Sequence, residues 1–385
     1  MSGYVGDGSE RAALAWLSRA CEPGEYALWA YVESQGAVEV AAQLAAGRAP
    51  GRLQRLCGAR AGEDRCQRDL DAARRVGARL IIPGDDEWPT DGVRLMSIAS
   101  AAGADGCVPP LSIWARGGGR LAALVDRSVA LVGARAATAY GTSVCEQIAY
   151  GLAHRDVTVI SGGAFGIDRA AHAAALAANG VTIAALACGI DRFYPKSNAG
   201  LLERITADGL LLSEWAPGAA PMRHRFLVRN RLIAALSSGT VVVEAALRSG
   251  ARSTAARARD LGKVVMTVPG PVTSAMSDGC LHMLREEAAL AVGCAEHVLE
   301  ATSLSGTDLL PLERGPGRPG DDLDPMHRRV LEAVPTRRAA TTESIAVVAG
   351  ASVPDTLRAL TMLELSQFVE QYEGRWRTYR KATSR

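Results

Sequence analysis

The stretch Val129–Gly141, VALVGARAATAYG, decides the fold. Four apolar residues suited to a buried β-strand lead into a glycine and then into a segment of helical composition. This order is typical of a nucleotide-binding α/β unit, in which the glycine turn and the helix N-terminus face a phosphate. A dinucleotide site would have its next glycine at the position of Arg135. The presence of an arginine in place of this glycine raises the question of which ligand such a turn would bind.

From Ser128 onward, apolar runs alternate with alanine-rich helical stretches. The runs are SVALVGA (128–134), VTVISGGA (157–164), TIAALACG (182–189), LLLSEW (210–215), TVVVEA (240–245) and VVMTVPG (264–270). Continuous Val, Ile and Leu predict strands buried on both faces, and intervening helices require parallel connections. The sequence therefore predicts an α/β fold with a doubly wound parallel sheet, whose ligands bind beyond the carboxyl ends of the strands.

The flanking segments have different patterns. Residues 1–78 show helical periodicity interrupted by Pro and Gly, which predicts a small helical domain before the α/β domain at 79–302. Residues 303–325 are rich in Gly, Pro and charge and are typical of a linker. Residues 326–385 carry three short helical patterns and two β-like runs around Glu373 and Gly374, which predicts a winged helix.

Composition narrows the functional class. The chain has 385 residues, 48% of them hydrophobic, with a net charge of +2. It shows neither the ~18-residue apolar run of a membrane span nor a secretory leader, so we expect a cytoplasmic protein without membrane contact. The eight cysteines are scattered without close pairs, so we expect mostly reduced, buried thiols and no metal site.

Several glycines and polar residues follow the first two strands of the regular α/β pattern. We expect them to form a phosphate loop consisting of Gly133, Ser161, Gly162, Gly163, Gly166 and Asp168. The glycines also fit a purely structural role, in which they only turn strand into helix. Asp168 and His172 are one helical turn apart, and we expect a hydrogen bond between them that shapes the loop.

The segment from Arg223 to Arg231 is basic, with four arginines, one histidine, no acid and Phe226 among them. Cations that follow a backbone, next to an aromatic ring on which a base can stack, are the parts of single-stranded nucleic-acid sites. We expect Arg229 to face differently from Arg225, and Asn230 to hold the loop through the backbone. The alternative for Phe226 is a core position at the start of a helix. The later Arg248, Arg252, Arg257 and Arg259 are interpreted as a solvated face.

Two other classes of function remain open. Glu214 and Glu244 end their strands, and SSGTVVVEA resembles part of the PGGxGTxxE signature of phosphoribohydrolases that cleave nucleoside monophosphates, with Glu244 as the acid. It lacks the double glycine, and no nucleophile elbow or Walker lysine occurs, so we expect no catalytic residues and no cofactor. A transcription regulator would read duplex DNA with SVPDTLRALTMLEL, but this segment has one arginine against two acids.

Together these motifs resemble the DNA-processing protein A family, also called Smf. The matching stretches run from DEWP and PPLSIWARG through VALVGARAATAYG, VISGGAFGIDRAAH, CGIDRFYPKSN and FLVRNRLIAALSSGTVVVEA to SGARSTAARARDLGKVVMTVPG. The resemblance implies an extended Rossmann domain that binds single-stranded DNA as a homodimer and loads the RecA recombinase during natural transformation. It also implies an N-terminal helical domain of the sterile-alpha-motif (SAM-like) type and a C-terminal winged helix.

The DNA-contacting positions of the family carry over to Arg135, Lys196, Phe226, Arg229, Asn230 and Arg231, and we add the neighbouring Arg223. The chain departs from the family at Leu227, where proline is usual, and at Leu281 and Glu287, where asparagine and glycine are usual. The resemblance thus answers the question raised by Arg135: the turn is expected to hold nucleic-acid phosphates rather than a dinucleotide pyrophosphate.

Overall fold

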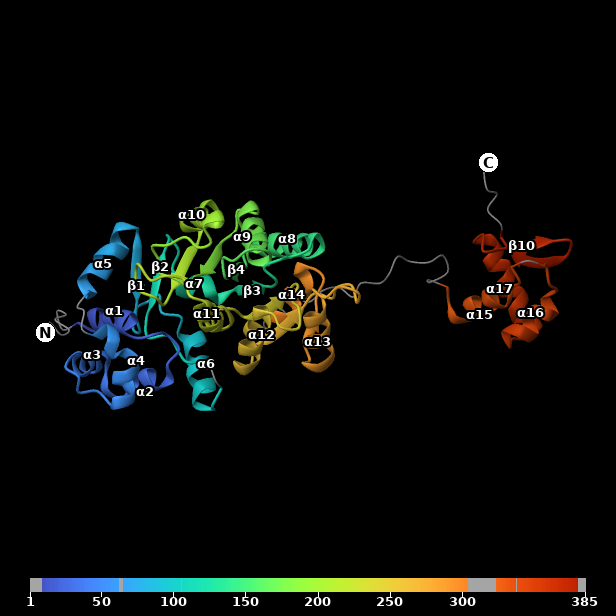
Figure 1. Ribbon diagram of the computed structural model, residues 1–385. Coiled ribbons are helices and arrows are strands. Elements are labelled where there is room, and N and C mark those ends of the chain that lie inside the picture. Colours follow the sequence, from blue (N-terminus) through green and yellow to red (C-terminus); the bar gives the residue numbers. More distant parts are fainter. Residues whose placement is uncertain (1–8, 62–64, 105, 304–322, 337, 380–385) are drawn as a thin grey trace. The chain divides into compact units, whose positions relative to one another are not determined.

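The computed structural model describes residues 9–61, 65–104, 106–303, 323–336 and 338–379 (Figure 1). Two compact units, Met1–Leu310 and Pro311–Arg385, are treated separately. In the described part of the first unit the sheet has nine strands, in the order β1-β2-β6-β5-β4-β3-β7-β8-β9. These are β1 (Ala78–Ile81), β2 (Ile113–Arg116), β3 (Ser128–Val132), β4 (Thr158–Ser161), β5 (Thr182–Ala185), β6 (Leu210–Ser213), β7 (Gly239–Val242), β8 (Val264–Thr267) and β9 (Leu290–Ala291).

The six strands expected from the apolar runs are all present, and neighbouring pairs from β6 through β8 are parallel. Along the chain, β4, β5 and β6 are added in turn on one side of β3, and β7 and β8 are then added on the other side of β3. The direction in which strands are added therefore reverses at β3. This reversal is the switch point of a doubly wound sheet, which confirms the expected α/β class. β2 and β1 extend the β6 edge as antiparallel strands.

Helices cover both faces of the sheet because alternate strand residues point to opposite sides. Val129 and Leu131 of β3 pack with residues of α8, α9 and α14, whereas Ala130 and Val132 pack with residues of α6, α11 and α12. Figure 1 shows α8, α9 and α10 on one side of the strands and α11 on the other. These helices are α6 (Thr90–Ala101), α7 (Leu121–Asp126), α8 (Ala139–Ala153), α9 (Ile167–Ala177), α10 (Ala199–Asp208), α11 (Arg223–Ala235), α12 (Gly250–Asp260), α13 (Asp278–Glu286) and α14 (Ala295–Thr302).

The expected N-terminal helices are present in the same compact unit as the sheet. They are α1 (Glu10–Ala20), α2 (Tyr26–Gln35), α3 (Ala37–Ala45), α4 (Gly51–Ala61) and α5 (Cys66–Arg75). Their buried residues share one core with Trp114 of β2 and Leu211 of β6. The boundary near residue 78 stays a prediction. A disulfide joins Cys21 to Cys57, which the scattered cysteine spacing gave no reason to expect.

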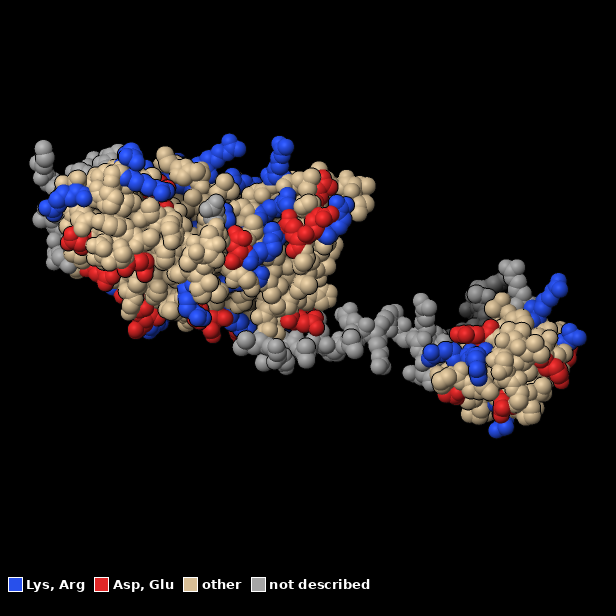
Figure 2. Space-filling view, turned by 90° about the horizontal axis from the view of Figure 1, so that it is seen from below, with Lys and Arg blue, Asp and Glu red and all other residues tan. Residues whose placement is uncertain are grey.

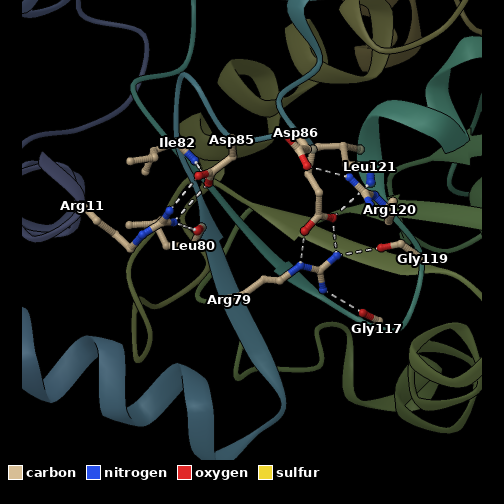
Figure 3. Close-up of polar contacts among 11 residues, drawn as sticks. Arg11, Arg79, Leu80, Ile82, Asp85, Asp86, Gly117, Gly119, Arg120 and Leu121 are labelled. Atoms are coloured by element: carbon tan, nitrogen blue, oxygen red, sulfur yellow. Dashed lines mark hydrogen bonds and ion pairs between the residues drawn. The ribbon is translucent and has the colours of Figure 1, made fainter.

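The DEWP segment (residues 86–89) joins β1 to the loop that follows β2 through partly buried polar contacts (Figure 3). Arg79 donates from Nε to Glu87 at 2.8 Å and from its other nitrogens to the carbonyls of Gly117 and Gly119 at 2.8 and 2.6 Å. Arg11 of α1 pairs with Asp85 at 2.7 Å, one residue before this motif. Asp85 therefore ties α1 to the segment after β1, and Glu87 of the motif ties β1 to the loop after β2; neither residue lines the candidate site.

The second unit forms the expected winged helix. Its described elements are α15 (Pro325–Ala333), α16 (Thr342–Ala349), α17 (Val353–Leu365), β10 (Val369–Tyr372) and β11 (Arg375–Thr378). The two strands pair in antiparallel register around Glu373 and Gly374, and a bridge joins Ala340 to Trp376. The expected linker falls largely on residues 304–322, outside the described residues. The single arginine of α17, Arg358, is paired with Asp355 at 2.8 Å.

Within the described ranges, no single helix is long and apolar enough to cross a membrane. Only α16 and α17 taken together, bent by 103°, pass that test, and residues from both helices form the core of the winged helix. On the face drawn in Figure 2, basic and acidic side chains lie side by side on both units. The charge pattern of this face therefore does not by itself indicate a ligand.

Glu22 links the helical segment to α11 and should make stability depend on pH. It accepts hydrogen bonds from Arg225 at 2.6 Å and from the Trp215 indole at 2.9 Å. Burial alone would raise the pKa of Glu22, but the bonds from Arg225, Trp215 and Arg60 outweigh it and lower the pKa to about 2 from 4.5. A depressed carboxyl pKa stabilises the fold above the unfolded value, and this contribution disappears as the pH falls toward 2.

We therefore expect Glu22→Gln to lower the free energy of unfolding at pH 7 and to flatten its fall between pH 4.5 and 2. Denaturant unfolding across this range measures both effects, with Glu33→Gln, an exposed glutamate of α2, as the control. An acid transition of unchanged steepness in Glu22→Gln would contradict the assignment.

Candidate functional site

A cleft of about 370 Å³ lies where β3 and β4 end and where α11 and α12 begin. It is positioned at the carboxyl edge, next to the switch point between β3 and β7. Five of the seven predicted DNA-binding residues line it: Arg135, Arg223, Phe226, Arg229 and Asn230. The fold thus brings together residues that are up to 95 positions apart in the sequence, as the motifs predict.

Phe226 and Arg135 form the most distinctive contact of the cleft. The Arg135 guanidinium carbon lies 4.7 Å from the centroid of the Phe226 ring, a cation–π distance. Tyr194 lies beside Phe226, with its ring centroid 5.9 Å away and tilted by 52°. Phe226 is only partly buried and belongs to no core cluster of the described residues, so the alternative core position is not the one observed.

Three predicted cations are exposed around the cleft. Arg135 follows β3, Lys196 begins the short 3-10 helix Lys196–Asn198 after β5, and Arg223 begins α11. No ion pair with another described residue involves any of the three. Lys196 lies outside the lining of the cleft itself, two residues after the exposed Tyr194. These side chains are free to meet an anion that approaches from solvent.

Arg229 lines the cleft but is only 4% exposed and is held internally. Its Nη1 donates to the carbonyl of Gly162 at 2.7 Å and to that of Ala185, at the ends of β4 and β5. Burial lowers the pKa of Arg229 to about 10, so the guanidinium remains charged at neutral pH. No hydrogen bond to another described residue involves its Nη2.

Arg225 and Arg231 face the protein interior. Arg231 is 1% exposed and pairs with Glu214, with Nη2 donating to Oε1 at 2.6 Å and Nε donating to the Val108 carbonyl at 2.7 Å. This placement argues against the expected direct phosphate contact and gives Arg231 a structural role. Arg225 bonds Glu22 and lies outside the cleft lining, whereas Arg229 lines the cleft, so the two side chains face different parts of the protein as expected, although both are buried.

Asn230 holds the cleft together, as expected. Its Nδ2 donates to the carbonyl of Gly250 at 3.2 Å, and its Oδ1 accepts from Nε of Arg229 at 3.3 Å. The Gly250 partner belongs to the N-terminus of α12, which also lines the cleft and has no acid in its first turn. The sequence motifs do not point to this helix end, although Ser249 before a helical run is a capping signal.

The glycine loop between β4 and α9 is shaped by close packing. A Cβ at Gly162 would lie 2.4 Å from Nη2 of Arg229, and a Cβ at Gly166 would lie 2.2 Å from the carbonyl of Ala134. Gly166 also has a φ of +70°, which disfavours other residues. A Cβ at Gly133 would meet Ile167 at 2.5 Å. These glycines therefore serve the structural role that the sequence left open, and among the loop glycines Gly133 lines the cleft.

Three polar residues of this loop bond within the protein. Ser161 is buried and donates to the carbonyl of Leu131 at 2.6 Å, so it does not face a phosphate. Asp168 lies in the first turn of α9 and accepts from the Ala164 amide at 3.3 Å. Burial raises its pKa, although nearby Arg229 opposes the rise. The carboxyl therefore occupies the α9 N-terminus in the place where a bound anion would lie.

The expected bond between Asp168 and His172 is absent from the described contacts. Nδ1 of His172 instead pairs with the Thr182 hydroxyl at 2.7 Å, and that hydroxyl donates to the carbonyl of Val159. Burial lowers the pKa of His172 to about 3, so the imidazole is neutral at pH 7. The prediction was wrong because the ring points into the sheet rather than toward the loop.

Glu244 has a structural environment. It is 2% exposed, and its two carboxylate oxygens accept from the Thr138 amide at 2.8 Å and the Thr138 hydroxyl at 2.6 Å. A Cβ at Gly141 would lie 2.3 Å from its carboxylate, so α8 begins in direct contact with it. Glu244 therefore caps the turn that carries Arg135. Glu214, the other strand-end carboxylate, is occupied by Arg231.

Glu287, one of the departures from the family, binds arginines that the sequence placed on a solvated face. Arg252 and Arg259 of α12 each lie 2.6 Å from one of its two carboxylate oxygens. These two arginines are therefore less available to a nucleic acid than Arg135 or Arg223.

Comparisons with known proteins give one consistent result. Residues 79–303 match the family described as DNA recombination-mediator protein A, and residues 314–375 match the DprA winged helix domain. A Mycobacterium tuberculosis relative, a putative DNA processing protein DprA, is 47% identical over 368 residues, 96% of this chain and 94% of the relative. Protein Smf of Escherichia coli is 35% identical over 69% of this chain and 71% of its own length. The X-ray structure of DprA from Streptococcus pneumoniae superposes with a TM-score of 0.60 and 29% identity, over 76% of this chain and 98% of that one.

The buried position of Arg231 predicts a loss of stability when it is replaced. Arg231→Met leaves Glu214 buried and unpaired, which should lower the free energy of unfolding by about 3 to 5 kcal/mol. Arg223→Met, at the exposed start of the same helix, should change it by less than about 0.5 kcal/mol. Chemical denaturation of both variants measures the difference, and equal stabilities would show that Arg231 does not have the assigned role.

Proposed function

Because the chain belongs to the DNA recombination-mediator protein A family, we propose that it binds single-stranded DNA along the cleft at the carboxyl edge of the sheet. The observation that carries the proposal is the exposed Arg135 stacked on Phe226, with Arg223 beside it and Lys196 on the neighbouring loop. A permanent cation and an aromatic ring at one place suit a ligand that has both phosphates and planar bases.

The phosphates are bound by groups on three sides. Arg135 follows β3, Lys196 follows β5 and Arg223 begins α11. Each cation therefore reaches the bound DNA from a different element of the fold. The N-terminus of α12 adds backbone N–H groups with a favourable dipole. We propose that Nη2 of Arg229, which has no hydrogen bond to another described residue, also donates to a phosphate where Arg229 lines the cleft. Arg231 is left out of this set because its guanidinium is paired with Glu214.

The base stacks where Arg135 now covers Phe226. A base reaches the Phe226 ring if the guanidinium swings toward a phosphate, or it stacks on the outer face of the guanidinium, since both planes are used in nucleic-acid recognition. In either arrangement Phe226 and Arg135 act as a unit. Their contributions to affinity are therefore coupled.

We propose binding rather than catalysis. The phosphoribohydrolase alternative requires Glu244 as an acid, but both of its oxygens accept hydrogen bonds from Thr138. This geometry favours a structural carboxylate. No cofactor enters the proposal.

The wider role follows from the family resemblance. We propose that the protein acts in the cytoplasm as a homodimer and loads the RecA recombinase onto incoming single-stranded DNA during natural transformation. The family membership supports this role without assigning the dimer or recombinase surfaces to particular residues. The winged helix is not proposed to read duplex DNA, since α17 has one arginine against two acids.

Salt dependence tests the proposed contacts. Arg135→Ala should weaken binding of an oligothymidylate and reduce the slope of log K against log salt by about 0.7, the value for one phosphate contact on a single strand. Phe226→Ala should weaken binding by about 1 to 3 kcal/mol. Because the two side chains are in contact, the double variant should lose less than the sum of the single losses. Fluorescence anisotropy at several salt concentrations measures all three.

Arg75→Ala, an exposed arginine of α5, serves as the control and should bind like the unaltered protein. Melting temperatures of the Arg135 and Phe226 variants exclude unfolding as the cause of a loss. An unchanged salt slope and affinity in Arg135→Ala would remove the DNA site from this cleft.

A further inference from the structure

Phe165 stands out among the phenylalanines of the chain. The chain has four. Phe193 and Phe368 pack against core clusters, and Phe226 lies under Arg135. Phe165, in the loop between β4 and α9, is 46% exposed, and no ring contact with another described residue involves it. Large aromatic side chains usually bury most of their surface, so an exposed ring beside a binding cleft requires an explanation.

The backbone on the N-terminal side of Phe165 is fixed. Nδ2 of Asn198 donates to the carbonyls of Gly163 and Ala164, both at 3.1 Å. Asp168 accepts from the Ala164 amide on the opposite side. Ala164 and Asp168 both line the cleft, so this part of the loop is held at its rim.

The backbone on the C-terminal side of Phe165 is fixed as well. The amide of Ile167 donates to the carbonyl of Ala134 at 3.2 Å, and the Cα of Gly166 is pressed against the carbonyls of Ala134 and Arg135. A rigid loop thus presents the phenyl ring to solvent. Such a ring binds a ligand with little loss of conformational freedom.

The position of the loop places Phe165 between two of the exposed cations. On its C-terminal side the loop passes close to Arg135, because a Cβ at Gly166 would lie 2.5 Å from the Arg135 carbonyl. On its N-terminal side Asn198, two residues after Lys196, donates to the carbonyl of Ala164. In the sheet, β4 lies between β3 and β5, and adjacent strands are about 4.8 Å apart. A chain that runs from Arg135 to Lys196 along the carboxyl edge therefore passes Phe165.

We propose that Phe165 is a second base-stacking position on the single-stranded DNA path, separate from Phe226. The inference rests on the proposed function and deepens it. Alternation of cations with aromatic faces is the arrangement that single-stranded sites use, because phosphates meet the cations while each base finds a ring. The occupant is therefore a base of the same strand whose phosphates are held by Arg135 and Lys196.

The test uses the full chain and an oligothymidylate long enough to cover the cleft. Phe165→Ala and Phe165→Leu should each weaken binding about 5- to 150-fold, the range for loss of one stacked base, with the salt slope unchanged. Phe165→Tyr should bind within about twofold of the unaltered protein. Because the ring is exposed, none of the three should change the melting temperature. Tyr150→Ala, a 49% exposed ring of α8, is the control and should bind normally.

An abasic oligonucleotide of the same length separates stacking from other effects, because it has phosphates but no bases. The unaltered protein and Phe165→Ala should bind it equally. Normal oligothymidylate binding by Phe165→Leu, or a loss that persists on the abasic strand, would overturn the stacking role. If Arg135→Ala loses affinity while Phe165→Ala does not, only this inference fails. If the unaltered protein does not bind oligothymidylate, the proposed function fails with it.

Discussion

The buried guanidinium of Arg229 fixes the geometry on which the site depends. From the middle of α11 it donates to the carbonyls of Gly162 and Ala185, at the ends of two adjacent strands. This contact holds α11 at the carboxyl edge of the sheet, with Arg223 and Phe226 in the N-terminal turn of the helix, beside the cleft. It also explains Gly162, because a side chain there would collide with Arg229. A cation that looks like a ligand contact in the sequence is thus mainly a structural element, since burying it requires those carbonyl partners.

The other charged residues around the cleft also divide into a structural group and an exposed group. Carboxylates hold the scaffold: Glu214 pairs with Arg231, Glu22 pairs with Arg225, and Glu244 caps the turn before α8. Among the predicted DNA-binding residues, Arg135, Lys196 and Arg223 have no carboxylate partner in the described part of the chain, and these three side chains are exposed. A basic segment in one stretch of sequence therefore separates into an internal set that positions α11 and an external set that is available to phosphates.

Much of the fold could be predicted from the sequence, because strands buried on both faces leave continuous apolar runs and the hairpin around Gly374 has a turn signal. The location of the cleft followed from the carboxyl-edge rule. The roles of individual arginines could not be predicted, because charge does not reveal burial and the partners, such as Glu214 for Arg231, lie far away in the sequence. The direction of His172 and the disulfide between Cys21 and Cys57 depend on tertiary packing that no local pattern records.

We propose that the cleft recognises bases that are exposed, as they are only in a single strand. A duplex keeps its bases stacked inside and offers the cleft phosphates alone. The most direct measurement compares the affinity of the full chain for a labelled single strand with its affinity for a duplex of the same length, at the same salt concentration. We expect at least about tenfold tighter binding of the single strand, or about 1.4 kcal/mol. Equal affinities, or a preference for the duplex, would contradict it.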